Sequence, residues 1–170
     1  MGTDKALIST DGITLVERAV GALTDAGAAP VIVVGGNRSA IETLNLSFVD
    51  DQWPGEGPLG GIITALEHLE TDLVAILSCD LTDASPIAVT SVVGALGHAD
   101  VAVPVIEGRM QWLHAVWRRS TLPELRKAFE SGVRAPREAL GSLRVAQLLD
   151  GDPCWFHDAD RPEDLPDQPR

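Results

Sequence analysis

The stretch "LVAILSCD", residues 73–80, decides the fold. Its first seven residues are apolar or small, and the eighth is an acid. Apolar residues on both faces are typical of a strand in a parallel sheet, which helices cover on both sides. In such folds the carboxyl ends of the strands hold metal and substrate ligands, so Asp80 is a candidate ligand. The spacing alone equally allows Asp80 to be a turn former before Thr82 and Asp83.

Helices and strands alternate on both sides of this stretch. A capping box at Thr14 and Glu17 predicts a helix that ends near Gly27, and a second box at 39–42 predicts a short helix. Apolar spacing, proline starts and a further capping box predict helices over 61–70, 86–97 and 121–132. Strands are expected over 31–35, 47–51, 100–106 and 111–119, and the alternation in the last of them predicts an antiparallel strand. The tail is expected to contain one more short helix, and a strand or two around 154–160.

This alternation predicts one Rossmann-like domain over residues 1–170, with 160–170 as a frayed tail. The expected architecture is a three-layer α/β/α fold with a mostly parallel sheet. A chain of 170 residues buries roughly two-thirds of its unfolded surface and needs no disulfide staples. We therefore expect a single hydrophobic core.

Charge and composition exclude several classes of function. A net charge of −12 without clusters of Lys and Arg argues against nucleic-acid binding. Cys79 and Cys154 stand far apart, and there is no signal peptide, which indicates a cytoplasmic protein without disulfides or a cysteine zinc site. The apolar runs are strand-sized, so no membrane span is expected.

A glycine-rich motif lies between a predicted strand and a predicted helix. "GEGPLG", residues 55–60, satisfies G-x-G-x-x-G, and Asp80 follows about 20 residues later, as in dinucleotide sites. Against a nicotinamide site, three residues separate the strand from Gly55, and Pro58 removes an N–H from the phosphate loop. A loop that needs glycine only for positive φ is the plainer interpretation.

Two further residues accompany Asp80 at the same predicted sheet edge. Asp51 ends the strand 47–51, and Lys5 lies close to the amino terminus. Lys5 alone would be read as a surface lysine. Together, a cation and two carboxylates at one edge indicate a site for an anionic small molecule, which an acidic protein can bind when a divalent cation and a placed lysine neutralise it locally.

Motifs along the whole chain carry a family resemblance. In order they are "MGTDKALI", "VIVVGGNR", "FVDD", "GPLGGI", "LSCD", "VPVIEGRMQWLHAVW", "GVRAPREAL" and "DADRPEDL". This series resembles the molybdenum cofactor guanylyltransferase family, the MobA-like nucleotidyltransferases. The resemblance implies the nucleotide-diphospho-sugar transferase type of Rossmann-like fold.

The resemblance also implies an activity, namely Mg²⁺-dependent transfer of GMP from GTP to molybdopterin with release of pyrophosphate. By the family's motifs, Lys5 would contact the GTP phosphates, Asp80 would hold Mg²⁺, and Asp51 would contact the nucleotide. Close backbone approach and a helix N-terminus would let four consecutive residues shape the nucleotide site: Gly57, Pro58, Leu59 and Gly60. Molybdoenzymes or other cofactor-biosynthesis proteins would be its protein partners.

The chain departs from the family pattern at several places. The family's first motif resembles L-A-G-G-x-S-x-R-M-G-x-D-K, and this sequence matches it only from Met1 onward. We therefore expect that the chain begins inside this loop, that the working protein begins upstream, and that the first strand is missing. That strand would lie mid-sheet between the strands at 31–35 and 73–78, so its absence would leave two apolar edges with unpaired backbone groups.

Smaller departures are Thr82 and Trp112, where the family commonly has proline, and D-A-D at 158–160 in place of N-x-N, which weakens any metal or pterin role there. Three functions remain open besides the guanylyltransferase. They are a relative that uses CTP, a non-catalytic relative that serves as a binding partner in cofactor biosynthesis, and the nicotinamide-binding protein suggested by residues 55–60.

Overall fold

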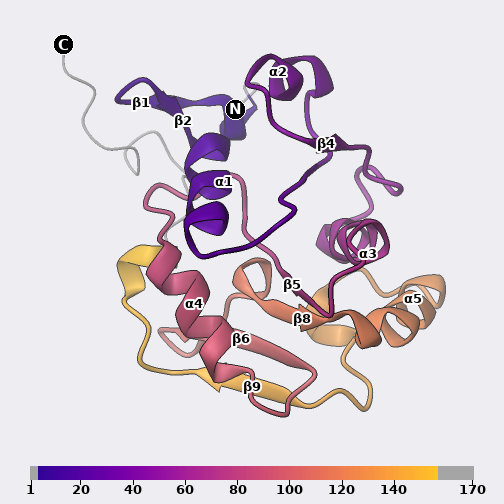
Figure 1. Ribbon diagram of the computed structural model, residues 1–170. Helices are drawn as coiled ribbons and strands as arrows, with labels where there is room; N and C mark the ends of the chain where they lie inside the picture. Colours follow the sequence, from indigo (N-terminus) through magenta and orange to yellow (C-terminus); the bar gives the residue numbers. More distant parts are fainter. Residues whose placement is uncertain (1–3, 157–170) are drawn as a thin grey trace.

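The structure, a computed structural model, describes residues 4–156. Five α-helices occur in this part of the chain: α1 (Leu15–Asp25), α2 (Arg38–Thr43), α3 (Pro58–His68), α4 (Pro86–Ala95) and α5 (Leu122–Glu130). The strands are β1 (Ser9–Thr10), β2 (Ile13–Thr14), β3 (Val33–Val34), β4 (Phe48–Val49), β5 (Leu73–Ala75), β6 (Val101–Ile106), β7 (Arg109–Met110), β8 (Val116–Arg118) and β9 (Val145–Leu148). Figure 1 shows their arrangement.

The main sheet mixes parallel and antiparallel pairs. Its order is β5-β8-β6-β7, and β9 pairs with β6 in parallel. β8 runs antiparallel to both β5 and β6. β3 and β4 form a separate parallel pair. The α/β class is thus confirmed, while the sheet is mixed rather than mostly parallel because β8 turns back between two strands of the other direction.

Helices cover both faces of this sheet, as successive residues of β6 show. Val101 and Val103 pack with α3 and α5, around Trp117, whereas Ala102 packs with α4 on the opposite face. α1 packs beside α4, and α3 packs beside α5 (Figure 1). Small and apolar residues on both faces of a strand therefore give the three-layer arrangement that the sequence predicted.

Helix starts agree only partly with the predicted capping boxes. The box at Thr14 and Glu17 forms completely at the start of α1. α2 instead begins after Asn37, whose side chain accepts the N–H of Ala40, so the prediction of a cap at residue 39 was wrong. At α5 the cap is also absent, because Thr121 has helical dihedral angles and its hydroxyl donates to the Arg118 carbonyl.

Two segments predicted as strands form turns. Residues 112–114 form a 3₁₀ turn before β8, so only the end of the stretch 111–119 is a strand. Residues 153–156 form another 3₁₀ turn, and 157–170 lie outside the described residues. A hairpin at β1–β2 was not predicted. Its turn is Asp11-Gly12, both with positive φ, which is a strong local signal for a two-residue hairpin.

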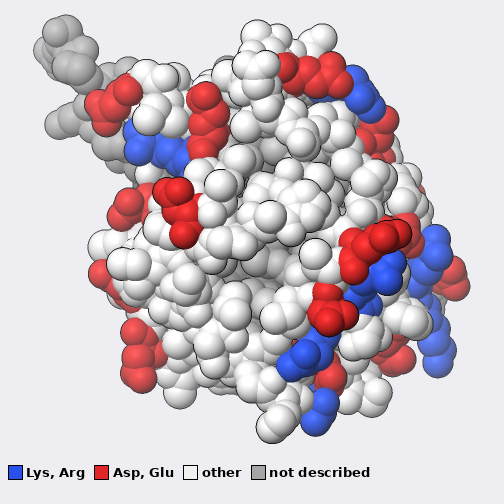
Figure 2. Space-filling model, in the orientation of Figure 1, with Lys and Arg blue, Asp and Glu red and all other residues white. Residues whose placement is uncertain are grey.

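No helix within residues 4–156 is long and apolar enough to cross a bilayer. Basic side chains on the α5 side of the molecule are interleaved with acidic ones (Figure 2). Arg126 pairs with Glu67 at 3.0 Å, and Arg134 pairs with Glu56 at 2.6 Å. This local neutralisation leaves no basic stripe there for a phosphate backbone.

An ion pair between Asp100 and Arg144 joins the start of β6 to the start of β9. The Asp100 carboxylate accepts from the backbone N–H of Arg144 at 2.9 Å and from its Nε at 3.0 Å, which lowers the pKa of Asp100 from 3.8 to about 2. A lowered folded-state pKa means that the stabilisation is present above about pH 4 and is lost as the pH falls through 2. We expect Asp100→Asn to flatten the dependence of the urea midpoint on pH between 4 and 2.

The measurement is urea unfolding of both proteins across that range. Asp25→Asn removes an exposed carboxylate at the end of α1 and should keep the slope of the unchanged protein. Equal slopes for the Asp100 variant and the unchanged protein would contradict the expectation.

Candidate functional site

The ends of β3, β4 and β5 converge on the first described residues. Lys5 Nζ lies 3.8 Å from an Asp80 carboxylate oxygen. A Cβ on Gly35 would lie 3.3 Å from the Cβ of Asp51, and one on Gly36 would lie 3.7 Å from the Asp4 carboxylate. The structure thus pairs Lys5 with Asp80, and Asp51 lies beside Gly35, next to the glycine that approaches Asp4.

A short turn presents Lys5 to Asp80. Asp4 caps the 3₁₀ turn at 5–7, since its carboxylate accepts the N–H of Ala6 at 3.2 Å. The Asp80 carboxylate is also held by the hydroxyl of Ser78, which donates to its other oxygen. The side chains of Lys5 and Asp80 remain 31% and 24% exposed. A partly exposed pair of this kind contributes little to stability.

Asp51 is held by the turn that follows β4. Its carboxylate accepts the N–H of Trp53 at 3.0 Å and lies 3.4 Å from the hydroxyl of Thr64 on α3. Thr64 is fully buried, and its hydroxyl also accepts the N–H of Gln52 at 3.3 Å. These bonds fix the carboxylate relative to both the loop and the helix.

The four residues at the start of α3 divide into two groups. Gly57 and Pro58 line the same cavity as Asp51. Leu59 is fully buried, and its N–H donates to the Arg134 carbonyl at 3.2 Å. Gly60 lies against Trp53 and donates its N–H back to Gly57. The N–H groups of Leu59 and Gly60 therefore already donate to carbonyl groups of the protein. Both residues are buried and do not line the cavity, so they hold the loop in place instead.

Cys79 lies between Ser78 and Asp80 but is unsuited to act as a nucleophile. Burial, reinforced by the charges of Asp80 and Asp4, raises the pKa of its thiol to about 11. The thiol is therefore protonated at neutral pH, and the nucleophilic form of cysteine is the thiolate. The chemistry at this edge rests on the lysine and the carboxylates.

Sequence reasoning missed the residues that support the site. Ser78 and Thr64 hold the two carboxylates, and Asp4 positions the lysine. Thr64 had a usable signal, since it is a polar residue between the apolar residues of α3. Asp158 and Asp160 lie outside the described residues. Within residues 4–156, no group of three His, Cys, Asp or Glu side chains is gathered as a metal site.

Gly57 adopts a backbone conformation that strongly favours glycine. Its φ is +93° and its ψ is 171°, and a Cβ would lie 3.3 Å from the Arg134 carbonyl oxygen. We expect Gly57→Ala to destabilise the protein by about 1–3 kcal/mol, because this dihedral region is strained for any residue with a side chain. Urea unfolding monitored by circular dichroism measures the change.

Gly61→Ala is the matched control for Gly57→Ala. Gly61 lies inside α3 with open space where its Cβ would be, so alanine should be neutral or stabilise by about 0.5–1 kcal/mol. The prediction fails if both alanine variants change stability equally.

Fold and site together define a class: an α/β protein with a lysine and a carboxylate paired where such folds hold their ligands, beyond the carboxyl ends of the strands. Residues 1–146 match the MobA-like NTP transferase domain, and the chain belongs to this family of nucleotidyltransferases. The family resemblance seen in the sequence is thereby confirmed, and the nicotinamide interpretation of residues 55–60 is set aside.

Two relatives are named as probable molybdenum cofactor guanylyltransferases. The protein from Chloroflexus aggregans is 34% identical over 84% of this chain and 71% of its own length. The protein from Methanothermobacter thermautotrophicus is 30% identical over 97% of this chain and 90% of its own length. The enzyme class predicted from the sequence, a guanylyltransferase-like nucleotidyltransferase, is confirmed.

Solved structures share the fold. Molybdopterin-guanine dinucleotide biosynthesis protein A from Archaeoglobus fulgidus superposes with a TM-score of 0.75 at 22% identity, covering 96% of this chain and 88% of that one. The 2-C-methyl-D-erythritol 4-phosphate cytidylyltransferase from Thermus thermophilus superposes with a TM-score of 0.73 at 20% identity, covering 95% and 90%. The predicted nucleotidyltransferase type of fold is confirmed.

Proposed function

We propose that this protein transfers GMP from GTP to molybdopterin and releases pyrophosphate, with Mg²⁺ as cofactor. The observation that carries the proposal is the pairing of Lys5 with Asp80 at 3.8 Å, beyond the carboxyl end of β5. The names of the relatives supply the donor base and the cofactor product. The proposal also includes a cytoplasmic location and contact with proteins that make or use the cofactor.

The reaction joins two anions, so the site has to neutralise charge and align the reactants. An oxygen of the acceptor's terminal phosphate attacks the α-phosphorus of GTP, the bond from that phosphorus to the bridging oxygen breaks, and pyrophosphate leaves with the electron pair. A phosphate monoester is largely ionised at neutral pH, so the attacking oxygen needs no general base. Lys5 would pair with the phosphates of the donor, and Asp51 would position the nucleotide.

The residues present suit a bound magnesium ion. Mg²⁺ prefers carboxylate oxygen and commonly takes only one or two carboxylates, with substrate phosphates and water completing its shell. Asp80 offers such a partly exposed carboxylate, and the absence of a three-ligand cluster within residues 4–156 matches this mode of binding. When bound, the ion would neutralise charge on the triphosphate and on the departing pyrophosphate.

The test is pyrophosphate release by the purified protein with molybdopterin and Mg²⁺, comparing GTP with CTP. We expect release with GTP and at least about tenfold less with CTP, as a site that reads polar groups of the base discriminates strongly. A preference for CTP would favour the cytidylyltransferase relative. No release with either nucleotide from a cooperatively folded protein would overturn the proposal and favour a non-catalytic binding partner.

A further inference from the structure

A smaller pocket lies beside the cavity that Asp51 and Pro58 line. The larger cavity measures about 570 Å³, and β3 and β5, which line it, do not pair with each other within residues 4–156, as expected from the sequence. The smaller pocket measures about 250 Å³ and is lined by Pro58 and by residues of the segments 111–114 and 135–137. We call the larger space the main cavity and the smaller one the side pocket.

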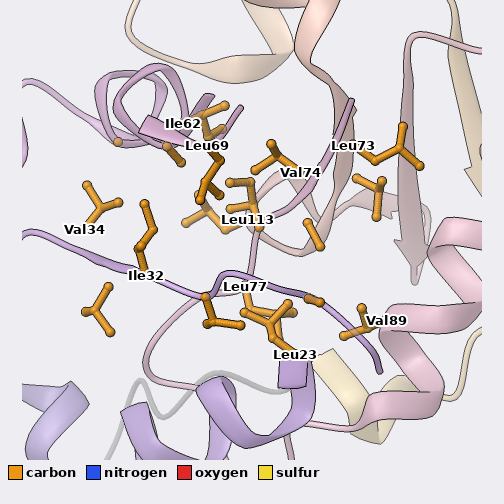
Figure 3. A pocket seen from close by; sticks show the side chains of 18 of the residues that line it. Leu23, Ile32, Val34, Ile62, Leu69, Leu73, Val74, Leu77, Val89 and Leu113 are labelled. Atoms are coloured by element: carbon orange, nitrogen blue, oxygen red, sulfur yellow. The ribbon is translucent and has the colours of Figure 1, made fainter. Parts of the chain in front are cut away.

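The two spaces are adjacent because they share wall residues. Pro58, the first residue of α3, lines both of them, and so does Leu113. Figure 3 shows the side chain of Leu113 among the apolar side chains of the main cavity. A ligand in the side pocket would therefore lie next to the loop at Gly57 and Pro58, which belongs to the proposed nucleotide site.

Two 3₁₀ turns frame the side pocket. The turn at 112–114 is fixed to the main sheet, because the N–H of Gln111 donates to the carbonyl of Pro104 on β6 at 2.9 Å. The turn Pro136–Glu138 follows Arg134, whose carbonyl holds the start of α3. The pocket is thus built between parts of the protein that are already fixed, as is usual for small-molecule sites.

The lining combines an aromatic surface with a few polar groups. Trp112 is half-buried, and its ring lies 6.1 Å from that of the fully buried Trp117. An aromatic ring that packs against the core and also lines a pocket offers a planar ligand a surface for stacking. Gln111 and the buried His114 add hydrogen-bonding groups to the same lining.

Arg137 gives the side pocket a positive charge. Its side chain is 72% exposed, and its ion pair with the neighbouring Glu138, at 3.4 Å, is a surface contact that contributes little. The described lining of the side pocket contains no Asp or Glu side chain. The pocket therefore suits a ligand that carries negative charge better than a neutral or cationic one.

The volume restricts the ligand to a single ring system. Drug-sized ligands occupy pockets of about 300–1,000 Å³, so a pocket of 250 Å³ suits a fused bicyclic ring rather than a whole nucleotide. Guanine and pterin both contain an aminopyrimidinone ring, whose N–H and C=O groups can pair with the amide of Gln111. In the proposed reaction the donor nucleotide uses the loop with Gly57 and the carboxylate of Asp51, which leaves the side pocket for the acceptor.

We infer that the side pocket binds the pterin ring of the acceptor, which stacks on Trp112 and places its anionic groups beside Arg137. The inference rests on the proposed function, since it takes molybdopterin as the acceptor. It assigns Trp112 and Arg137 to recognition of the acceptor and gives them no part in holding GTP.

The first experiment detects binding directly and requires no turnover. Pterin-6-carboxylate is titrated into the ¹⁵N-labelled 170-residue protein, and the indole N–H signal of Trp112, assigned by its loss in Trp112→Phe, is followed. We expect a saturable shift, and at least about tenfold weaker binding to Trp112→Leu. GMP, which offers the same aminopyrimidinone ring, should bind there at least about tenfold more weakly. No shift with the pterin, or a tighter site for GMP, would overturn the inference.

Arg137→Gln tests the charge of the side pocket without disturbing the core, because this side chain is exposed. It should weaken binding of pterin-6-carboxylate about fivefold. The matched control is Lys127→Gln, which changes the net charge equally at an exposed position of α5 outside the lining and should leave the affinity unchanged. Equal weakening by both variants would reduce the effect to the overall charge of the protein and remove Arg137 from the pocket.

Transfer kinetics separate this inference from the proposed function. Trp112→Leu should raise KM for molybdopterin at least about tenfold and leave KM for GTP within about twofold, and Trp112→Phe should largely restore the acceptor KM. Transfer with an unchanged acceptor KM in both Trp112→Leu and Arg137→Gln would overturn the inference while the proposed function stands. A saturable shift at Trp112 without transfer by any of the proteins would overturn the proposed reaction and support the side pocket as a pterin site.

Discussion

Asp80→Asn is expected to lower kcat for nucleotidyl transfer about 10²–10³-fold, the usual effect of removing one preorganised electrostatic group. Asparagine keeps the shape of the side chain and can still accept the hydroxyl of Ser78, so the fold should persist. It removes the negative charge that faces Lys5 and would hold Mg²⁺. Pyrophosphate release at saturating GTP measures the loss, and a rise in the Mg²⁺ concentration needed for half-maximal rate would tie it to the metal.

Asp83→Asn is the matched control. Asp83 lies three residues further on and is exposed, so its neutralisation changes the net charge equally without altering the pair at Asp80. Its kcat should stay within about twofold of the unchanged protein. A folded Asp80→Asn protein that is as active as the Asp83→Asn protein would remove Asp80 from the proposed machinery.

Trp117→Ala is expected to lower the free energy of unfolding by about 3–5 kcal/mol, the range for truncating a large aromatic residue in a core. Trp117 is fully buried on β8, between β5 and β6, and its ring lies 6.1 Å from that of Trp112. A loss of this size is a large share of a typical domain's stability, so part of the protein should be unfolded at 37 °C. Urea unfolding at 25 °C measures it.

Trp117→Phe separates packing from hydrogen bonding. The buried indole N–H of Trp117 has no hydrogen-bond partner in the described structure, so phenylalanine gives up volume but removes an unsatisfied donor. We expect a loss below about 2 kcal/mol, clearly smaller than for alanine. Equal losses for the two variants would show that the indole makes a polar contact that the structure does not contain.

The sequence predicted the architecture well where one local pattern decided the outcome. The alternation of elements and the capping box at Thr14 and Glu17 led to features that the structure contains. The apolar stretch at 73–80 is a strand only over Leu73–Ala75, and this strand pairs antiparallel with β8 rather than in parallel. Capping predictions were wrong at residue 39 and at Thr121, because two side chains at the right spacing do not by themselves set where the helical dihedral angles begin. Tertiary contacts decided those starts.

For the site, the sequence placed Lys5, Asp51 and Asp80 at one edge; the structure pairs Lys5 with Asp80 and places Asp51 beside Gly35. Their roles toward nucleotide and metal remain predictions. The sequence did not reveal that Leu59 turns into the core, since its spacing fits a loop residue as well as a core residue. The partners of the carboxylates, Ser78 and Thr64, depend on contacts between elements that periodicity does not encode.

The bond between the Leu59 N–H and the Arg134 carbonyl has a consequence for how such proteins diverge. The guanidinium of Arg134 also covers the ring of Phe129 at 4.0 Å and pairs with Glu56, and these two contacts depend on the residue type. The carbonyl contact does not, because every amino acid supplies the same backbone oxygen. Mutations at position 134 can therefore accumulate while the start of α3 keeps its anchor, and an alignment of relatives would record variability at a position that is structurally constrained.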